Sequence, residues 1–467
     1  MKFEIVSHAC ASVESRGVRL VIDPWLNGPV YWGAWWHCPA PVFDESLYKA
    51  DYVYITHWHF DHMHEESLRH FDRSCHMLVP KFPVSIMAEG LRALGFQNVT
   101  ELDHGVPMAL AEGFDFTSYQ VSYQDDSVAV IESEGVVIVD LNDSKPLTRA
   151  WKTFRDRYPT VDFMFRSHSP AWSYPSAYTF EVPEEAIPVT RESYVEAFHS
   201  AAEVLKPRYA VPFASGVCHP HPDLIEDNAD VVSAFELKDY IDAHPLSQTE
   251  LVIMPHGSSW DSEAGFSIDM NDAVRDASAY VAEHAHESKA YFEQLAQEES
   301  EVTLEFSLFE TYFRDFLRSM MLPVRPFLNI TWAFEIEQGG RTEYWSVAFR
   351  SGKIARHERA PEDATSVIRA PVAVLDDAFK TSVFTNIDIS KRWQVHVRRG
   401  GVTRHMLACV LVALHEAGYT KLSNVLSWRF FRGIFARRAE AMDYLALSFN
   451  VLRSGPGSVA KAVTELD

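Results

Sequence analysis

The chain has 467 residues and a formal net charge of −23; 47% of its residues are hydrophobic and 23% are charged. This is the composition of an ordinary globular protein of about two to four domains, and the negative charge disfavours general binding of nucleic acid or of anionic membranes. The five cysteines are scattered without a Cys-x-x-Cys motif, which disfavours a disulfide scaffold, a thiolate zinc site and an iron–sulfur cluster.

Two features that the sequence lacks bear on location. No apolar run reaches the roughly 18 residues of a membrane-spanning helix. No basic segment followed by an apolar one stands after Met1, as a secretory signal would require. We therefore expect a cytoplasmic protein without a membrane span.

Short apolar strands alternate with helices in the first half of the chain. The sequence predicts strands where Val, Ile, Tyr and Phe gather, at 2–8, 18–25, 51–57, 76–80, 114–122, 128–133 and 135–141. Helical patterns fall at 65–71, 84–95 and 193–206. Because strands and helices interleave, we expect a layered α/β domain over residues 1–265.

The stretch HWHFDH, at residues 57–62, directly follows the apolar strand pattern DYVYI. Residues two apart point the same way in an extended turn, so His57 and His59 can hold one metal ion while Asp61 and His62 face a neighbouring position. Imidazole and carboxylate groups are common metal ligands. A polar loop of surface histidines is the alternative, which four such side chains directly after a buried strand disfavour.

This motif resembles the signature of the metallo-β-lactamase superfamily. Residues 7–36, which carry a histidine and an Asp-Pro-Trp turn ahead of the motif, resemble one branch of it. That branch includes the lactonase-like proteins and the C-terminal part of CMP-N-acetylneuraminate hydroxylases, and the segments 139–146, 169–178 and 206–215 are most similar to the hydroxylase type. The resemblance covers about residues 1–260 and implies an αββα sandwich of the metallo-β-lactamase type.

The resemblance also implies a dinuclear metal site and assigns its ligands by position. The motif supplies four of them: His57, His59, Asp61 and His62. Asp61 would also take part in catalysis. The family's bridging aspartate ends a later strand, where GVVIVDLND offers Asp143, with Asp140 as the alternative. Either aspartate could instead be an ordinary turn residue.

One ligand of the family pattern is missing. The family usually supplies a third histidine between the motif and the bridging aspartate, but the only histidine after His76 in this interval, His104, stands too early. The expected stretch, 118–133, offers Gln120, Gln124, Asp125, Asp126 and Glu132 instead. We choose Asp126 as the metal ligand; a hairpin turn at 125–126 is the alternative.

The family's last histidine should follow a strand near residue 165. His168, in FMFRSHSP, stands there and would be both a ligand and a catalytic residue, although a capping role also fits. Four further histidines could line the site: His8 and His256 near strand ends, and His219 and His221 in a Pro-rich loop. His64 and His70 are expected to be solvated side chains of the helix after the motif.

The second half of the chain has a different texture. Residues 266–300 are polar, acidic and helical, and we expect a connector there. Residues 301–467 predict an α+β accessory domain, with strands at 329–336, 343–350 and 392–399 and helices at 308–321, 405–418 and 439–453. The stretch 327–379 resembles sterol-carrier-like domains, which implies an apolar cavity for a lipid or a carrier-bound acyl chain.

Mixed imidazole and carboxylate ligands favour iron for the two metal ions, with zinc or manganese as alternatives. The first hypothesis is an iron-dependent oxygenase or hydroxylase acting on a small or carrier-bound metabolite. The family's hydroxylases carry a Rieske cluster, whose paired Cys-x-His motifs this chain lacks, so an external electron donor would be needed, or a substrate that is itself oxidised. The alternatives are a metallohydrolase of the lactonase, esterase or phosphodiester type and a non-catalytic binding module.

Overall fold

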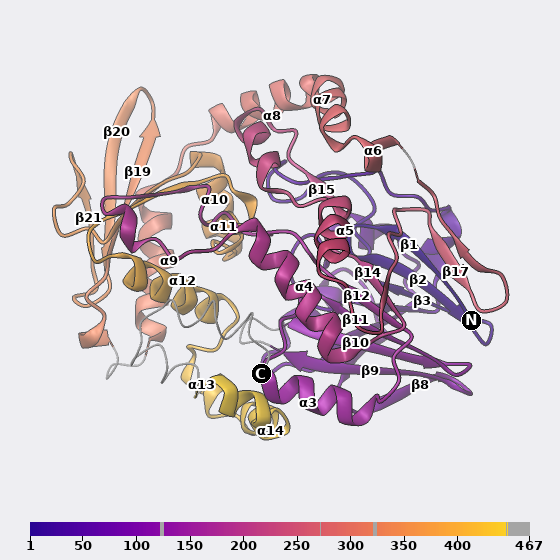
Figure 1. Ribbon diagram of the computed structural model, residues 1–467. Coiled ribbons are helices and arrows are strands. Elements are labelled where there is room, and N and C mark those ends of the chain that lie inside the picture. The colour runs from indigo at the N-terminus through magenta and orange to yellow at the C-terminus, as the bar shows by residue number, and fades with distance from the viewer. Residues whose placement is uncertain (122–125, 271, 321–324, 445, 447–467) are drawn as a thin grey trace.

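The computed structural model describes residues 1–121, 126–270, 272–320, 325–444 and 446 (Figure 1). Two β-sheets pack face to face in the first half of the chain, with helices on their outer faces. This is the αββα sandwich that the resemblance implied. A third sheet with its own helices forms a second body, built chiefly from the second half of the chain.

The first sheet has the strand order β18-β17-β1-β2-β3-β5-β6-β7. Its strands β3, β5, β6 and β7 are parallel, so their carboxyl ends lie at one edge, where loops can gather functional side chains. Helices α1 (Glu65–His70) and α2 (Ile86–Ala93) cover its outer face. The strands are β1 (Lys2–Ser7), β2 (Cys10–Ser15), β3 (Val18–Ile22), β5 (Tyr52–Tyr54), β6 (His76–Pro80), β7 (Val99–Leu102), β17 (Ser259–Asp261) and β18 (Gly265–Ser267).

The second sheet has the order β16-β14-β12-β11-β10-β9-β8. Helices α3 (Thr148–Arg157), α4 (Arg191–Leu205) and α5 (Ala234–Ala243) lie along its outer face in Figure 1. The strands are β8 (Pro107–Ala111), β9 (Phe114–Val121), β10 (Asp126–Ser133), β11 (Val136–Asn142), β12 (Phe163–Arg166), β14 (Tyr209–Pro212) and β16 (Glu250–Leu251).

Successive side chains along each strand point to opposite faces of the sheet, and in these strands both faces are buried. On β11, Ile138 points into the core between the two sheets, whereas its neighbour Val139 packs under the helices. On β12, Phe163 and Phe165 enter the inter-sheet core and Met164 faces the helices. Burial on both faces requires the near-continuous runs of Val, Ile and Phe that the sequence shows.

The second body is built around a six-stranded sheet of order β13-β23-β22-β19-β20-β21. Its core is rich in aromatic side chains from helix α9 and the sheet. The strands are β13 (Tyr178–Phe180), β19 (Thr331–Gln338), β20 (Arg341–Ala348), β21 (Lys353–His357), β22 (Ser366–Arg369) and β23 (Gln394–Val397), and the helices are α9 (Phe306–Ser319), α10 (Val372–Thr381), α11 (Asn386–Ser390) and α12 (Val402–Glu416). This is the C-terminal α+β domain that the sequence predicted.

One edge strand of that sheet comes from the first half of the chain. Strand β13 pairs with β23, and Tyr174 and Tyr178 are part of the aromatic core of the second body. Further contacts join the two bodies: Trp35 Nε1 donates to Ile389 O at 3.1 Å, and Trp393 Nε1 donates to Ser173 Oγ at 2.7 Å. The two bodies therefore share a polar and aromatic interface.

Smaller elements complete the fold. The acidic connector expected at 266–300 contains helices α6 (Asp272–Arg275), α7 (Ala277–Glu287) and α8 (Lys289–Glu301). Strands β4 (Trp36–His37) and β15 (Val217–Cys218) form a two-stranded sheet, and α13 (Leu422–Val425) and α14 (Trp428–Ala436) follow α12. Short 3-10 helices span Glu45–Lys49, Pro183–Glu185, Pro222–Asp230 and Arg325–Phe327. The helix expected at 439–453 lies largely outside the described residues.

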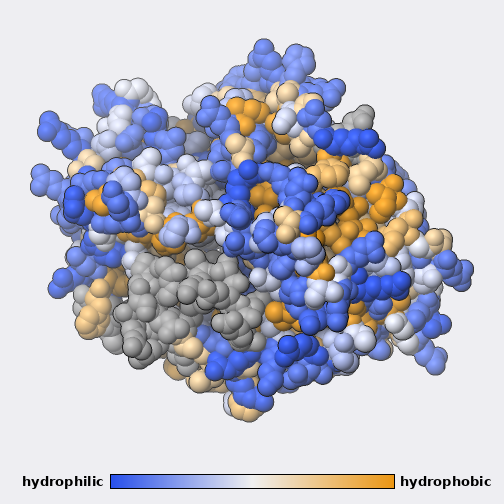
Figure 2. Space-filling model, in the orientation of Figure 1, coloured by the Kyte–Doolittle hydropathy of each residue, from blue (hydrophilic) through white to orange (hydrophobic). Residues whose placement is uncertain are grey.

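The surface carries the mixture of polar and apolar residues expected from the composition. Hydrophilic residues cover much of the face shown in Figure 2, with hydrophobic patches between them. Of the described helices, none is both long enough and apolar enough to cross a membrane.

Candidate metal centre

The HWHFDH loop follows β5 at the edge where the parallel strands of the first sheet end. Backbone bonds from His62 N and Met63 N to His59 O, at 3.1 and 2.8 Å, close the loop into a tight turn. His57, Asp61 and His62 are 2%, 3% and 0% exposed. The motif is therefore a buried, ordered turn, in contrast to the solvated loop that was the alternative.

The first two histidines of the motif converge. His57 Nε2 lies 2.8 Å from His59 Nδ1, and the two ring centroids are 4.5 Å apart. The ring of His62 lies 4.0 Å from that of His57. One group of potential ligand atoms, all within 4.8 Å of one another, consists of His57, His62 and Asp143.

A second group of potential ligands adjoins the first and consists of His8, Asp61 and His62. His8 Nε2 lies 3.1 Å from Asp61 Oδ2, and His62 Nε2 lies 3.2 Å from the same oxygen and 3.3 Å from Asp143 Oδ2. His8, which follows β1, was a minor candidate in the sequence. The structure brings it to the motif although 49 residues of chain separate it from His57.

Asp23 contacts His62 through the ring nitrogen that does not face Asp61 and Asp143. This buried residue, at the end of β3, has Oδ2 2.8 Å from His62 Nδ1 and accepts hydrogen bonds from Thr56 Oγ1 at 2.6 Å and from Asn142 Nδ2 at 2.7 Å. It thereby fixes the ring of His62 with Nε2 toward Asp61 and Asp143. Asp23 is the first residue of the Asp-Pro-Trp turn, but nothing in the sequence indicates its contact with His62.

Tyr31 is a second residue that sequence reasoning missed. Its hydroxyl donates to Asp61 Oδ1, while Asp61 Oδ2 faces His8 and His62. Tyr31 is 1% exposed and packs with Trp25 and Trp35, which excludes water from this side of Asp61. No local pattern in the sequence marks Tyr31, because its contact with Asp61 spans 30 residues.

The electrostatics suit cation binding. Burial and the neighbouring rings of His62 and His59 hold the pKa of His57 well below its usual range, and desolvation lowers the pKa of His59 to about 4. Both rings are therefore neutral near pH 7, the form that binds metal. Burial opposes protonation of His62, but the carboxylates of Asp61 and Asp23 raise its pKa well above the usual range. A divalent cation at Nε2, between the carboxylates of Asp61 and Asp143, would replace the proton on that nitrogen.

Unsatisfied polar atoms support the same conclusion. Within the described part of the chain, His62 Nε2 and His8 Nδ1 are buried without a hydrogen-bond partner of good geometry. A buried ring nitrogen without a partner costs free energy that a metal–ligand bond would recover. The residues present thus fit a metal ion at this position.

The later aspartates take different places. Asp143 joins the cluster, whereas Asp140 is buried in β11 with its carboxylate Oδ1 accepting from Asn142 N at 3.0 Å. Asp126 Oδ1 lies 3.6 Å from His57 Nδ1, on the side of the ring opposite the nitrogen that faces His59. Burial, with Asp143 nearby, raises the pKa of Asp126 to about 7. Asp126 belongs to neither cluster in the described structure, and Thr56 Oγ1, at 3.0 Å, lies closer to His57 Nδ1. Asp126 as a metal ligand remains a prediction.

The remaining histidines are not part of the two clusters. His168, the expected last ligand, packs its ring 6.5 Å from that of Phe198 on α4, and neither ring nitrogen has a hydrogen-bond partner among the described residues. His219 Nδ1 faces Ala34 O at 3.1 Å, and His256 Nδ1 faces Ala40 O at 3.3 Å. His221 caps the 3-10 helix at Pro222–Asp230. His168 as a ligand and catalytic residue remains a prediction.

The two histidines after the motif differ from each other. His64 is buried and caps helix α1, with Nδ1 accepting from Ser67 N at 3.3 Å, so the expectation of a solvated side chain was wrong for it. His70 lies near the end of α1 and is exposed, as expected. Of the alternatives for the missing ligand, Gln124 and Asp125 lie outside the described residues; Gln120 instead donates through Nε2 to Leu102 O, at 3.0 Å.

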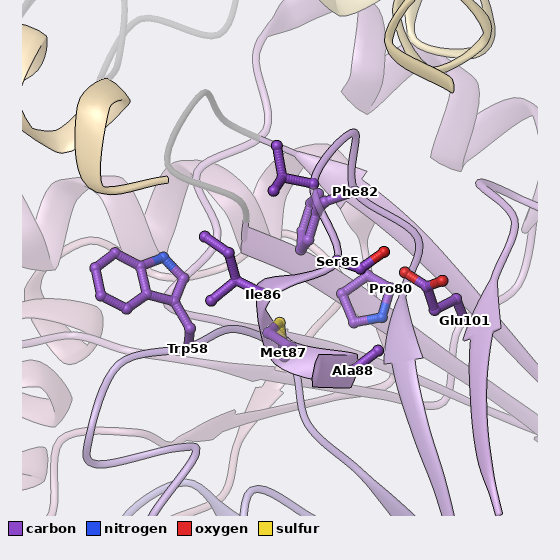
Figure 3. Close-up of a pocket in the computed structure, with 9 residues that line it drawn as sticks. Trp58, Pro80, Phe82, Ser85, Ile86, Met87, Ala88 and Glu101 are labelled. Atoms are coloured by element: carbon purple, nitrogen blue, oxygen red, sulfur yellow. The ribbon is translucent and has the colours of Figure 1, made fainter. Parts of the chain in front are cut away.

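A small pocket lies beside the metal loop (Figure 3). Trp58, between His57 and His59, stands on one side of it, and Glu101 and Ser85 stand on the other. Most of its lining is apolar, and none of the clustered ligands contributes to it: Trp58, Pro80, Phe82, Val84, Ser85, Ile86, Met87, Ala88 and Glu101. It is separate from the candidate centre.

Known proteins resemble parts of this chain. A family model described as "Beta-lactamase superfamily domain" matches residues 2–142. A protein of Mycolicibacterium smegmatis named as a Rieske 2Fe-2S iron–sulfur protein is 26% identical over 252 residues, which is 50% of this chain and 48% of that protein. The cytidine monophosphate-N-acetylneuraminic acid hydroxylase of Mus musculus is 24% identical over 329 residues, 62% of this chain and 56% of that protein.

The chain thus spans about half the length of the curated relatives it matches. These matches confirm the resemblance to the hydroxylase-like branch of the metallo-β-lactamase superfamily. Among solved structures, an isothiocyanate hydrolase from Delia radicum gut bacteria is 16% identical and covers 56% of this chain and 98% of its own, with a TM-score of 0.42. CmlA, a diiron β-hydroxylase from Streptomyces venezuelae, is 18% identical and covers 54% and 52%, with a TM-score of 0.38. Scores this low carry no argument.

Proposed function

Because residues 2–142 match the β-lactamase superfamily domain, we propose that this protein is a metalloenzyme with a dinuclear centre at the HWHFDH loop. His57 and His59 would hold one ion, Asp61, His62 and His8 would hold the other, and Asp143 would be a ligand shared by both. The observation that carries the proposal is the convergence of two ligand groups that share His62: His8, Asp61 and His62 in one, and His57, His62 and Asp143 in the other.

Bound cations would supply Lewis-acid chemistry for hydrolysis or, with iron, redox chemistry with dioxygen. The chain's own residues prepare the site for either. Asp23 orients His62, and the Tyr31 hydroxyl holds Oδ1 of Asp61, whose Oδ2 faces His8 and His62. Burial keeps His57 and His59 neutral and therefore available as ligands.

The favoured activity is an iron-dependent oxygenase or hydroxylase acting on a small or carrier-bound metabolite. Carboxylate oxygens beside imidazoles favour iron or manganese over zinc, and the matched relatives include hydroxylases. Since the chain has no paired Cys-x-His motif for a Rieske cluster, an external electron donor would supply the electrons. A metallohydrolase using the same two ions is the second candidate, because the same ligand set also accepts zinc.

Metal analysis of protein purified without added zinc tests the proposal. About two irons per chain, with oxygen uptake under a reductant, would support the oxygenase. Zinc alone, with turnover of a panel of lactones and esters, would support the hydrolase. Protein that holds no metal would contradict both and leave a binding module.

A pair of variants assigns the metal to the loop. His59→Ala should lose metal and activity together. His70→Ala, which removes an exposed histidine eleven residues further along the same segment, is the matched control and should keep both. Equal metal contents in the two variants would refute the assignment of His59.

A further inference from the structure

A buried arginine that forms no ion pair with any described residue lies next to the candidate centre. Arg166, the last residue of β12, is 6% exposed. In the described part of the chain its side chain makes one hydrogen bond, from Nη1 to Ser144 O at 3.3 Å, and Nε is buried without a partner. Burying a guanidinium without a partner is costly, so such a residue points to a negative group that binds there.

The position of Arg166 relates it to the bridging aspartate. Strand β12 runs parallel to β11 with Arg166 opposite Asn142, and the carbonyl that Arg166 contacts belongs to Ser144, directly after Asp143. Alternation along β12 places Arg166 on the same face as Met164, which packs toward helix α4. The guanidinium therefore stands between the metal edge of the sheet and α4.

A second cation and a hydroxyl stand beside this position. Lys145 is exposed, and its Nζ lies 5.6 Å from the ring centroid of Tyr194 on α4. Trp172 Nε1 donates to the Tyr194 hydroxyl at 2.6 Å, and no described residue accepts a hydrogen bond from that hydroxyl. Neither Lys145 nor Arg166 forms an ion pair with a described residue. Among the described residues, two cations and an O–H donor thus lack a hydrogen-bonded anion, and Asp143 is the carboxylate that acts on both cations.

We propose that Arg166, Lys145 and Tyr194 form an oxyanion-binding subsite for a carboxylate or phosphate group of the substrate. This inference rests on the proposed function. In the metal-free chain the Asp143 carboxylate would offset these cations, but as a bridging ligand its charge is taken up by the metal ions. The subsite then carries an uncompensated positive charge beside the reacting centre, in a protein whose net charge is −23.

The consequence is a substrate class: an anionic metabolite, or a carrier-bound one with an anionic group next to the reacting carbon. The exposed Lys145 would meet the ligand first. The buried Arg166, whose fork favours planar oxyanions, would then fix its orientation. A neutral ester or lactone would leave both cations unpaired and would bind poorly.

Calorimetric titration of the metal-loaded protein with inorganic phosphate, acetate and neutral acetamide tests the subsite. We expect phosphate or acetate to bind and acetamide not to bind. Lys145→Met should weaken anion binding about tenfold or more, because charge-assisted hydrogen bonds contribute that much. Arg166→Gln should weaken it further. Lys152→Met, at an exposed lysine of α3, is the matched control and should bind as the unaltered protein does.

Metal content measured on the same samples separates the two proposals. Unchanged anion affinity in Lys145→Met would overturn the subsite, even if Arg166→Gln failed to fold. If the protein held no metal, the dinuclear centre would fall, and anion binding that depends on Lys145 would still support the subsite. Loss of metal in Lys145→Met, together with loss of anion binding, would overturn the subsite as a separate feature.

Discussion

Both halves of the molecule contain buried histidines, but the groups that contact these histidines differ. In the second body, His405 Nδ1 pairs with Ser366 Oγ at 2.9 Å and His415 Nδ1 pairs with Ser319 Oγ at 2.9 Å, inside an aromatic core. At the metal loop, His57 and His62 face other ring nitrogens and carboxylates. His405 and His415 thus each have a neutral hydroxyl beside Nδ1; Nε2 of His415 also lies 3.7 Å from Asp315 Oδ2, an exposed carboxylate.

Burial lowers the pKa of His405 to about 3, and it lowers the pKa of His57 as well. Burial and a low pKa therefore do not distinguish a structural histidine from a metal ligand. What distinguishes them is convergence: several nitrogens and carboxylate oxygens within reach of one point, some without a hydrogen-bond partner. The predictions below test whether that difference has the consequences we assign to it.

The largest contrast is expected between His62→Ala and His405→Ala. His62→Ala should lose at least one of the two metal ions and essentially all activity, because His62 Nε2 lies between both carboxylates. His405→Ala should keep the metal and instead lower the free energy of unfolding by about 2–5 kcal/mol, as other large buried side chains do when truncated. Metal analysis and denaturant unfolding of both variants measure the two effects.

Metal loss in His405→Ala, at a temperature where the variant is folded, would contradict the distinction between structural histidines and metal ligands. A folded His62→Ala that retains two ions would show that its ring only fills space. Circular dichroism on the same samples establishes that each variant is folded.

A carboxyl of the second body should impose a pH dependence unrelated to metal. Burial raises the pKa of Glu416 from 4.5 to about 7. Since the folded state holds this proton more tightly than the unfolded one, stability is greatest below about pH 4.5 and falls as pH rises toward 7. The loss is at most about 3 kcal/mol. Hydrogen bonds donated by Tyr312 and by Phe384 N to the carboxylate already limit how far its pKa rises.

Glu416→Gln should remove that slope between pH 5 and pH 8, whatever its effect on absolute stability. Urea unfolding at several pH values, on metal-free and metal-loaded protein, is the measurement. Equal slopes in the variant and the unaltered protein would mean that Glu416 ionises normally in the fold.

Features that local sequence determines could be predicted, whereas features that depend on contacts between distant residues could not. The positions of the motif at 57–62 and of Asp143 were predictable because each follows an apolar strand whose carboxyl end fixes its position. His8, Asp23 and Tyr31 reach the same point only through strand pairing and side-chain contacts of 30 residues or more.

The same limit explains what the sequence did not predict about the second body. Strand β13 has no pattern that would assign it to a sheet formed mostly after residue 330, since its partner β23 lies more than 200 residues away. Asp126 was chosen as a ligand by its place in the chain. The structure places its Oδ1 3.6 Å from His57 Nδ1, whereas His57 Nε2 is the nitrogen that faces His59. Its role as a ligand remains a prediction.

Asp23→Asn tests the support behind the metal loop. The substituted amide would present an NH₂ group to donors such as Thr56 Oγ1 and Asn142 Nδ2, so His62 would lose its fixed orientation. We expect metal affinity to fall about 10- to 100-fold, as for other residues that orient metal-binding histidines. Competition with a chelator measures the affinity. Asp51→Asn, which alters an exposed aspartate bonded to Arg19 N, should leave it unchanged.

The smallest effect is expected at His64, which sits two residues beyond the motif yet resembles the structural histidines. Its Nδ1 caps α1 and contacts Ser67 Oγ at 2.8 Å, and burial lowers its pKa to about 4. His64→Ala should keep the metal and lose about 0.5–2 kcal/mol of stability at neutral pH, the usual value of an N-cap. His64→Asn should restore most of this.

The pH dependence of His64 gives an independent readout. A ring whose folded pKa is lowered from 6.5 to about 4 stabilises the fold above pH 6.5, and this contribution is lost as pH falls toward 4. His64→Ala should therefore differ most from the unaltered protein above pH 6.5 and least near pH 4. Metal loss in His64→Ala would mean that His64 is also a metal ligand. A stability difference between the variant and the unaltered protein that grows on acidification would contradict the lowered pKa of His64.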